Sequence, residues 1–249
     1  MDHKILRELM GGNIAAVEVR GDVVLPDAWK AKIDEKDTQA PCIYARILSN
    51  EATGNSPTGS QVSRVIELLR RYRSRGDKRY QDAYRIDNAT RARCDISSSK
   101  RGSIYYLADK EGYLLKRRRE QVLAFCSSVD RSIAAIPKED IDQPMKHAFH
   151  YIGYMMHYKS RHAAHRADDG RSNFLMNLFH KACIVALPNS GNWVLRDWPL
   201  AFCATVSEAR IGELAPTLMA DSLCESGGGF VVCPAGLSGP NMDNMTARE

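Results

Sequence analysis

The 249-residue sequence is 44% hydrophobic and 26% charged and has a formal net charge of +5, a composition that is typical of a folded globular protein and argues against wholesale disorder. No apolar run reaches the roughly 18 residues that a transmembrane helix needs, and the N-terminal residues carry charges where a secretory signal has an apolar stretch. These features predict a protein of the cytoplasm or nucleus without membrane association, in which the seven scattered cysteines are reduced thiols.

The first part of the chain predicts short helices around one strand. A helix at residues 4–10 is followed by a Gly-Gly break and an extended stretch at 17–26. Residues 41–50, PCIYARILSN, are rich in β-branched and aromatic side chains and predict a strand. Residues 51–60 predict a loop and residues 60–75 a helix. One face of that helix carries Val62, Val65, Ile66, Leu69 and Tyr72.

The middle of the chain is basic and predicts less regular structure. Residues 76–101 predict an irregular segment, and residues 103–118 predict a β-hairpin with ADKEG as its turn. Residues 119–135 predict an amphipathic helix that Pro137 ends.

Beyond Pro144 the sequence predicts a strand at residues 146–155, KHAFHYIGYM, and then a helix to about Arg166. A second helix is predicted at residues 172–187, where Ser172 can act as the N-cap. Pro188 follows that helix directly and ends it.

The last part of the chain predicts an extended stretch at residues 195–206 and a helix at 207–223. Ser207 can cap this helix and Pro216 can bend it. A glycine-rich loop, GGGFVVCPAGLSG, then leads into a polar tail that we expect to be flexible.

The charge is distributed unevenly along the chain. Residues 64–119 contain 17 Lys and Arg against 7 Asp and Glu, a local excess of 17 − 7 = +10, whereas residues 188–249 contain 3 against 7, or −4. This asymmetry predicts a polyanionic partner for the basic region, although a solvated helix face explains the same pattern. The residues predicted to contact nucleic acid are Arg64, Arg70, Arg71, Arg73, Arg75, Lys116, Arg117 and Arg118.

One stretch of the second half places several reactive side chains at regular spacing. Residues 151–165 read YIGYMMHYKSRHAAH, so that a Tyr-Ile-Gly at the end of the predicted strand precedes Arg161 and His165. The intervals are 161 − 151 = 10 and 165 − 161 = 4. Residues four apart share one face of a helix, so Arg161 and His165 are predicted to lie together near Tyr151.

This stretch resembles the core of the GIY-YIG nuclease superfamily, which has Y-x-G, an arginine ten residues after the tyrosine and a histidine four residues later. The resemblance covers about residues 145–235 and implies an α+β fold (an α/β sandwich) with a small mixed sheet flanked by helices. The chain then divides into a basic helical and hairpin region at residues 1–100, a GIY-YIG-like module with an insertion at 101–240, and a flexible tail at 241–249.

The resemblance also implies a metal site. The family carries a glutamate on a later helix that holds a divalent ion, and Glu213 in ARIGELAPTL occupies the corresponding place. Glu208, one turn earlier, is the second candidate. Glu213 is thus expected to bind Mg²⁺, with no organic cofactor.

The implied reaction is hydrolysis of a phosphodiester, which needs an attacking water, a proton acceptor and positive charge at the phosphate. Tyr151 or Tyr105 is expected to accept or relay the proton of the water, and His165 to orient that tyrosine. Arg161 is expected to bind two phosphate oxygens through its planar guanidinium.

The sequence departs from the family at two places. The first motif, Gly-Ile-Tyr, has no match shortly before Tyr151, and the candidates are Tyr105 after Ile104 and Tyr44 after Ile43. Val231 stands where the family has an asparagine near GGGF.

Three functions are compatible with these patterns. The first is a Mg²⁺-dependent endonuclease. The second is a tRNA-dependent enzyme similar to the fungal synthases of arginine-containing cyclodipeptides, and the third is a non-catalytic nucleic-acid-binding relative. All three predict DNA or tRNA as the partner.

Overall fold

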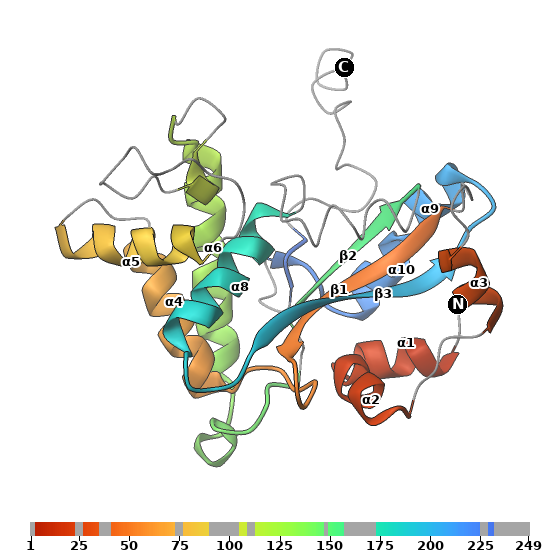
Figure 1. The fold of residues 1–249 in the computed structure, drawn as a ribbon, viewed down its shortest axis with the longest axis horizontal. Helices are drawn as coiled ribbons and strands as arrows, with labels where there is room; N and C mark the ends of the chain where they lie inside the picture. Colours follow the sequence, from red (N-terminus) through yellow and green to blue (C-terminus); the bar gives the residue numbers. More distant parts are fainter. Residues whose placement is uncertain are drawn as a thin grey trace.

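The computed structural model describes residues 3–22, 27–34, 41–72, 77–89, 105–108, 113–146, 149–156, 173–224 and 229–231. The elements up to residue 100 are α1 (His3–Met10), α2 (Ile14–Arg20), α3 (Asp27–Asp34), β1 (Cys42–Asn50), α4 (Gly59–Tyr72) and α5 (Asp77–Asn88). Those after it are η2 (Tyr105–Leu107), α6 (Lys116–Ala134), η3 (Lys138–Asp140), β2 (His150–Met155), α8 (Phe174–Ala186), β3 (Trp193–Phe202), α9 (Val206–Gly212) and α10 (Leu214–Met219). Helices around a small sheet confirm the predicted α+β class (Figure 1). Within these ranges, no helix has both the length and the apolar composition to cross a bilayer.

The sheet has the strand order β2-β1-β3, and β1 is antiparallel to both of its neighbours. An isolated parallel bridge joins His150 of β2 to Gly229. The central strand comes from the predicted first region, and the two outer strands come from the predicted module. The two regions therefore share one sheet.

Strand β1 is buried on both of its faces. Every residue from Cys42 to Ser49 is buried, which explains the almost continuous apolar run of its sequence. Because side chains alternate along a strand, β1 presents one set to each side of the sheet. We call the side that carries Cys42, Tyr44, Arg46 and Leu48 the tyrosine face, and the side that carries Ile43, Ala45 and Ile47 the opposite face.

Part of the tyrosine face packs against a layer of helices. Leu48 belongs to a hydrophobic core that includes buried residues of α4, α6 and α8, and these helices gather on one side of the molecule in Figure 1. The centre of this core is aromatic. The rings of Phe125 and Phe230 are stacked with centroids 5.2 Å apart, and those of Phe149 and Phe179 lie 4.7 Å apart.

The opposite face is covered by α1, α2 and α9. Ile43, Ala45 and Ile47 form a second core with Ile5 and Leu9 of α1, with Ile14 and Val17 of α2, and with Ala209 of α9. The packing of α9 is close, because a Cβ on Gly212 would stand 2.9 Å from Ile43 Cδ1. Helix α10 continues from α9 and contacts β2.

The extended stretch predicted at residues 17–26 is wrong at 17–20, because α2 occupies Ile14–Arg20, and its residues 23–26 lie outside the described ranges. Its β-branched residues suit a strand locally, but Ile14, Ala15, Ala16 and Val17 are buried against the sheet as a helix. Helix α2 ends at Gly21, whose φ of 76° is the left-handed conformation that glycine adopts readily.

Two predictions for the basic middle region are also wrong. Residues 77–88, predicted to be irregular, form α5, and the predicted hairpin is reduced in the described residues to η2 and one bridge between Ala108 and Leu114. Long-range hydrogen bonds fix this arrangement. The Tyr72 hydroxyl donates to Asp87 Oδ1 at 2.7 Å and accepts from the Tyr106 N–H at 3.1 Å. Burial and the Asp87 carboxylate raise the pKa of Tyr72 well above its usual value, so the hydroxyl stays a donor.

The strand predicted at residues 41–50 and the helices predicted at 60–75, 119–135 and 172–187 are confirmed to within a few residues. The caps differ, since Asn173 and Thr205 accept the backbone N–H groups in place of the predicted Ser172 and Ser207. The helix predicted at 207–223 is divided into α9 and α10 at Glu213. Pro216 explains the division, because it has no N–H to continue the helical hydrogen bonds and its ring crowds the preceding turn.

Glycines 54 and 21 provide a matched test of how the opposite face is packed. Both have positive φ, 70° and 76°, but a Cβ on Gly54 would lie 2.3 Å from the Ala15 carbonyl oxygen, whereas one on Gly21 meets nothing within 4 Å. We expect Gly21→Ala to lower the free energy of unfolding by about 1–2 kcal/mol, the cost of the left-handed conformation. Gly54→Ala should cost at least about 2 kcal/mol more, because backbone must move. Urea titrations of both variants measure this difference, and equal losses would contradict the close approach of this loop to α2.

Candidate functional site

Two tyrosines lie side by side on the tyrosine face. Tyr44 of β1 is directly opposite Gly153 of β2 in the antiparallel register. The ring centroids of Tyr44 and Tyr151 are 6.1 Å apart and the rings are inclined by 59°. Tyr44 is 1% exposed and Tyr151 is partly exposed, so the pair connects the sheet interior with the surface.

Gly153 explains how the Tyr151 ring is placed. A Cβ at this position would lie 2.6 Å from Tyr151 Cε1 and 3.0 Å from its hydroxyl oxygen. The Tyr151 ring therefore lies over Gly153 and leans along its own strand toward the row that contains Tyr44. A Tyr-x-Gly sequence has this consequence in a strand because residues two apart lie on the same face.

The sequence left two tyrosines open as the partner of Tyr151, and the structure favours Tyr44. Tyr105 lies in η2, which contacts α8, and its N–H points to Asp87 Oδ2 at 3.4 Å. Its ring packs against Tyr106 with centroids 5.2 Å apart. Of the two candidates, Tyr44 is the one whose ring contacts Tyr151, and Tyr105 as a site residue stays a prediction.

A buried ion pair continues the site across the sheet. Arg46 is opposite Tyr151 on one side and Asp197 on the other, so the three residues form one row over three strands of the tyrosine face. Arg46 Nε lies 3.7 Å from Asp197 Oδ1, and their side chains are only 7% and 3% exposed. Sequence reasoning missed this pair, although a single arginine within the apolar run CIYARILS was a visible signal.

The structure does not bring Glu213 to the tyrosines. It follows Gly212, where an added Cβ would lie 2.9 Å from Ile43 Cδ1, and it joins α9 to α10 on the opposite face of the sheet. Glu213 is 2% exposed, and its backbone is tied into the helices by Glu213 N–H to Ala209 O and by Thr217 Oγ1 to Glu213 O. The elements that carry Tyr151 and Glu213 therefore lie on different sides of the sheet, and the metal role that the resemblance implies for Glu213 stays a prediction.

A magnesium site that combines Glu213 with the tyrosine face does not fit this geometry. A bound Mg²⁺ needs oxygen ligands at about 2.0–2.1 Å from one small centre, and the sheet separates the Glu213 helices from Tyr151. In the part of the chain that the structure describes, no group of three or more His, Cys, Asp and Glu side chains lies together.

Arg161 and His165 lie outside the described residues. Of the nearby histidines, His180 of α8 has a structural role. Its Nε2 is 2.8 Å from the Trp193 carbonyl oxygen, and burial lowers the pKa of His180 to about 4. His180 is therefore neutral at pH 7 and ties α8 to β3.

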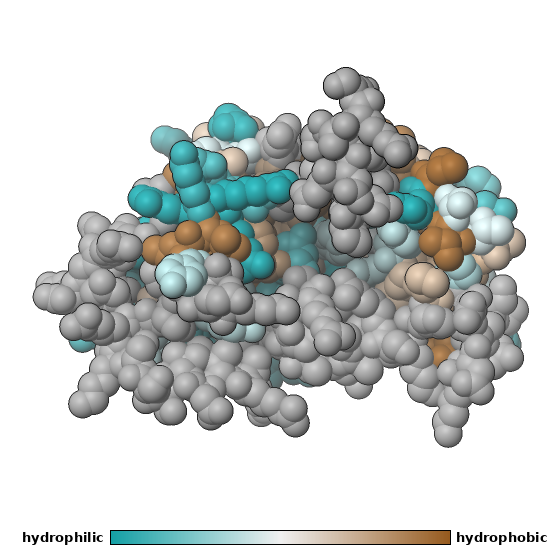
Figure 2. Space-filling model, turned by 90° about the horizontal axis from the view of Figure 1, so that it is seen from above, coloured by the Kyte–Doolittle hydropathy of each residue, from teal (hydrophilic) through white to brown (hydrophobic). Residues whose placement is uncertain are grey.

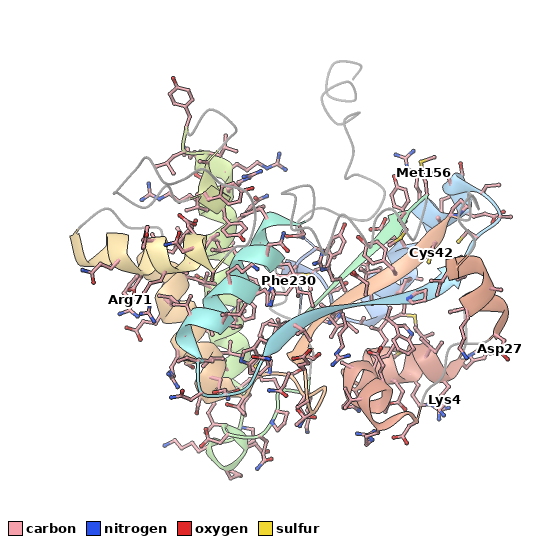
Figure 3. All side chains as sticks on the ribbon, viewed as in Figure 1. Lys4, Asp27, Cys42, Arg71, Met156 and Phe230 are labelled. Atoms are coloured by element: carbon pink, nitrogen blue, oxygen red, sulfur yellow. The ribbon has the colours of Figure 1, made fainter. Side chains whose placement is uncertain are left out.

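The arginines predicted to bind nucleic acid on α4 make contacts within the protein. Arg64 Nη2 donates to the Ala186 carbonyl oxygen at 2.8 Å, and Arg70 forms an ion pair with Asp130 of α6. Arg71 lies 3.4 Å from Asp82 of α5. Figure 3 shows Arg71 at the helical end of the molecule, far from Cys42 and Met156 at the end of the sheet nearest the tyrosines. These arginines join helices to one another, and Arg73 and Arg75 lie outside the described residues.

The basic residues at the start of α6 divide into two kinds. Arg118 points inward, where its Nη1 donates to the carbonyl oxygens of Tyr106 and Ala108 at 3.2 and 2.9 Å and its guanidinium lies 5.0 Å from the Phe174 ring centroid. Lys116 and Arg117 are exposed, and Lys116 Nζ is 3.7 Å from Glu120. Of the predicted residues on this helix, Lys116 and Arg117 are exposed, as Arg70 and Arg71 are on α4.

Comparison with known proteins identifies no relative of this chain. The chain matches no protein-family model, no curated protein and no solved structure. The function must therefore be argued from the two tyrosines, the buried ion pair and the surface charges.

The role of Gly153 is testable. Gly153→Ala should displace the Tyr151 ring, because the new methyl group would overlap it. In protein labelled with ¹³Cζ-tyrosine, we expect the Tyr151 resonance to shift and the Tyr154 resonance to stay. Gly212→Ala is the matched control on the opposite face, where the added methyl meets the flexible end of Ile43. An unchanged Tyr151 resonance in Gly153→Ala would contradict the placement of the ring.

Proposed function

We propose that this protein is a GIY-YIG-like enzyme that hydrolyses phosphodiester bonds of nucleic acid on the tyrosine face of its sheet. The observation that carries the proposal is that Ile43-Tyr44 and Tyr151-Ile152-Gly153 lie on adjacent antiparallel strands, with Tyr44 directly opposite Gly153. The resemblance needs a tyrosine from each of two such motifs, and Tyr44 and Tyr151 meet that need with ring centroids 6.1 Å apart.

In this proposal a few side chains carry out the hydrolysis of the phosphodiester. A water oxygen attacks phosphorus and one ester P–O bond breaks; the water loses a proton to the site, and the leaving oxygen takes up a proton and departs as an alcohol. A phenol of the Tyr44–Tyr151 pair can relay that proton. Arg161, by resemblance, binds the phosphate oxygens that gain negative charge, and His165 orients a phenol.

None of the residues used in this proposal is assigned to hold Mg²⁺. When bound, a divalent ion supplies positive charge to the phosphate and its leaving oxygen. Because Glu213 belongs to the opposite face, the residues that this proposal uses are Tyr44, Tyr151, Arg161 and His165.

The surface charge at the start of α6 supports a nucleic-acid substrate. Lys116, Arg117 and Arg119 are exposed at the start of α6 and can contact phosphates. Such a substrate also agrees with a cytoplasmic or nuclear location, which we propose on the same ground.

A second candidate is a nucleic-acid-binding relative without catalysis. The position of Glu213 favours it, since the carboxylate that the resemblance assigns to metal binding is 2% exposed within helices of the opposite face. Val231 at the expected asparagine position points the same way.

Turnover of defined substrates separates these candidates. We expect the protein to cleave at least one of plasmid, single-stranded DNA and total tRNA, assayed with Mg²⁺ and with EDTA. Tyr151→Phe should lower the rate about 100-fold or more, as should Arg161→Ala, the usual cost of losing one acid–base or oxyanion-binding group. Arg161→Lys should recover only part of the rate, because an ammonium lacks the bidentate guanidinium geometry.

Glu213→Gln is the matched control, because it keeps the shape of a buried side chain and changes only its charge. On this proposal its rate per folded molecule stays within about threefold of the parent. If Glu213→Gln is as inactive as Tyr151→Phe and its melting temperature is unchanged, Glu213 takes part in the reaction and this assignment of residues is wrong. Affinity without cleavage of any substrate would instead support the binding relative, and intact tRNA with a new small-molecule product would support a tRNA-dependent synthase.

A further inference from the structure

The start of α6 carries an exposed aromatic side chain directly before its cationic residues. Tyr113 is 73% exposed and Leu114 is 42% exposed. Lys116, Arg117 and Arg119 follow within two helical turns, and all three are exposed. Figure 2 looks onto this end of the molecule and shows strongly hydrophilic side chains beside a hydrophobic patch on its left, where α6 begins in Figure 1.

The charge of this surface is positive. Its exposed charged residues between 113 and 120 are three cations (Lys116, Arg117 and Arg119) and Glu120, which gives 3 − 1 = +2. The one acidic residue, Glu120, lies 3.7 Å from Lys116, whose side chain remains 90% exposed. A surface with this excess is complementary to a polyanion.

The backbone beneath Tyr113 is held in place. The Leu115 N–H donates to the Leu107 carbonyl oxygen at 2.8 Å, and Leu114 forms a bridge with Ala108. Arg118 adds two hydrogen bonds to the same turn and packs on Phe174. Because these contacts hold the backbone next to Tyr113, the ring can bind at a smaller entropic cost than a side chain whose backbone makes no such contacts.

We propose that Tyr113, Lys116, Arg117 and Arg119 form a binding surface for single-stranded nucleic acid, with Tyr113 stacking on an unpaired base. The cations contact the sugar-phosphate backbone, and the phenol ring provides the flat surface that a base requires. Bases in a duplex are already stacked on one another, so this surface favours single strands over duplex. The inference rests on the proposed function, because it specifies the substrate as unpaired nucleic acid.

Binding, measured separately from cleavage, tests this surface. The probes are a fluorescent 12-nucleotide oligothymidylate and a hairpin duplex of 12 base pairs, titrated in EDTA with the full chain by fluorescence anisotropy. Tyr113→Ala should weaken binding of the single strand about 5- to 100-fold, the range for losing one stacked base. It should change binding of the duplex less than twofold, and Tyr113→Phe should bind like the parent.

Tyr84→Ala is the matched control, because Tyr84 is an exposed tyrosine on α5, outside this surface, and we expect it to bind like the parent. The double variant Arg117→Gln and Arg119→Gln should reduce the slope of log affinity against log salt by about 1.4, or about 0.7 for each phosphate contact to a single strand.

Several outcomes would overturn the inference. The first is that Tyr113→Ala binds the single strand as tightly as the parent does. The second is that Tyr113→Ala loses as much affinity for the duplex as for the single strand. The third is that Tyr113 is needed to bind phosphatidylserine vesicles and not the oligonucleotide. Cleavage that survives Tyr113→Ala with unchanged affinity would overturn the inference and leave the proposed function intact. Tyr113-dependent binding of the single strand without cleavage of any substrate would support the inference and overturn the proposed function.

Discussion

The structure depends on the burial of β1 between two layers and two partner strands. Its main chain pairs with β2 and β3, and its side chains from Cys42 to Ser49 are all buried. A strand in this position must satisfy every hydrogen bond through its neighbours and fill two cores at once. The same constraint decides the chemistry, because alternation sends Tyr44 and Arg46 to one face and Ile43, Ala45 and Ile47 to the other.

The two faces have different characters as a result. The opposite face is an apolar core closed by α1, α2 and α9, and the helix break at Glu213 belongs to this layer. The tyrosine face combines apolar packing at Leu48 with the polar row of Tyr151, Arg46 and Asp197. Burying an ion pair costs several kcal/mol of desolvation, and apolar residues of similar volume are often as stabilising. The charged row therefore adds less stability than its buried position suggests.

Local patterns predicted the elements whose side chains follow one simple period. The face of Val62, Val65, Ile66, Leu69 and Tyr72 gave α4 correctly, and the β-branched run at residues 41–50 gave β1. Helix α2 could not be predicted in this way, since its valines suit a strand until the packing against Ile47 and Trp198 is known. The contact of Tyr44 with Tyr151 joins residues 151 − 44 = 107 positions apart. The packing of α9 against the sheet decides on which face Glu213 lies. Such long-range contacts leave no trace in the spacing of a single motif.

The central claim is that nucleic acid binds to the tyrosine face of the sheet and not to the face on which Glu213 lies. Tyr154 lies on the same strand as Tyr151 but on the opposite face, where its ring centroid is 5.9 Å from the Arg210 guanidinium. The most direct measurement is a titration of ¹³Cζ-tyrosine-labelled protein with a cleavage-resistant phosphorothioate oligonucleotide, with resonances assigned through single Tyr→Phe variants. The account predicts saturable shifts of Tyr44 and Tyr151 and a constant Tyr154 resonance. Shifts confined to Tyr154 would contradict it.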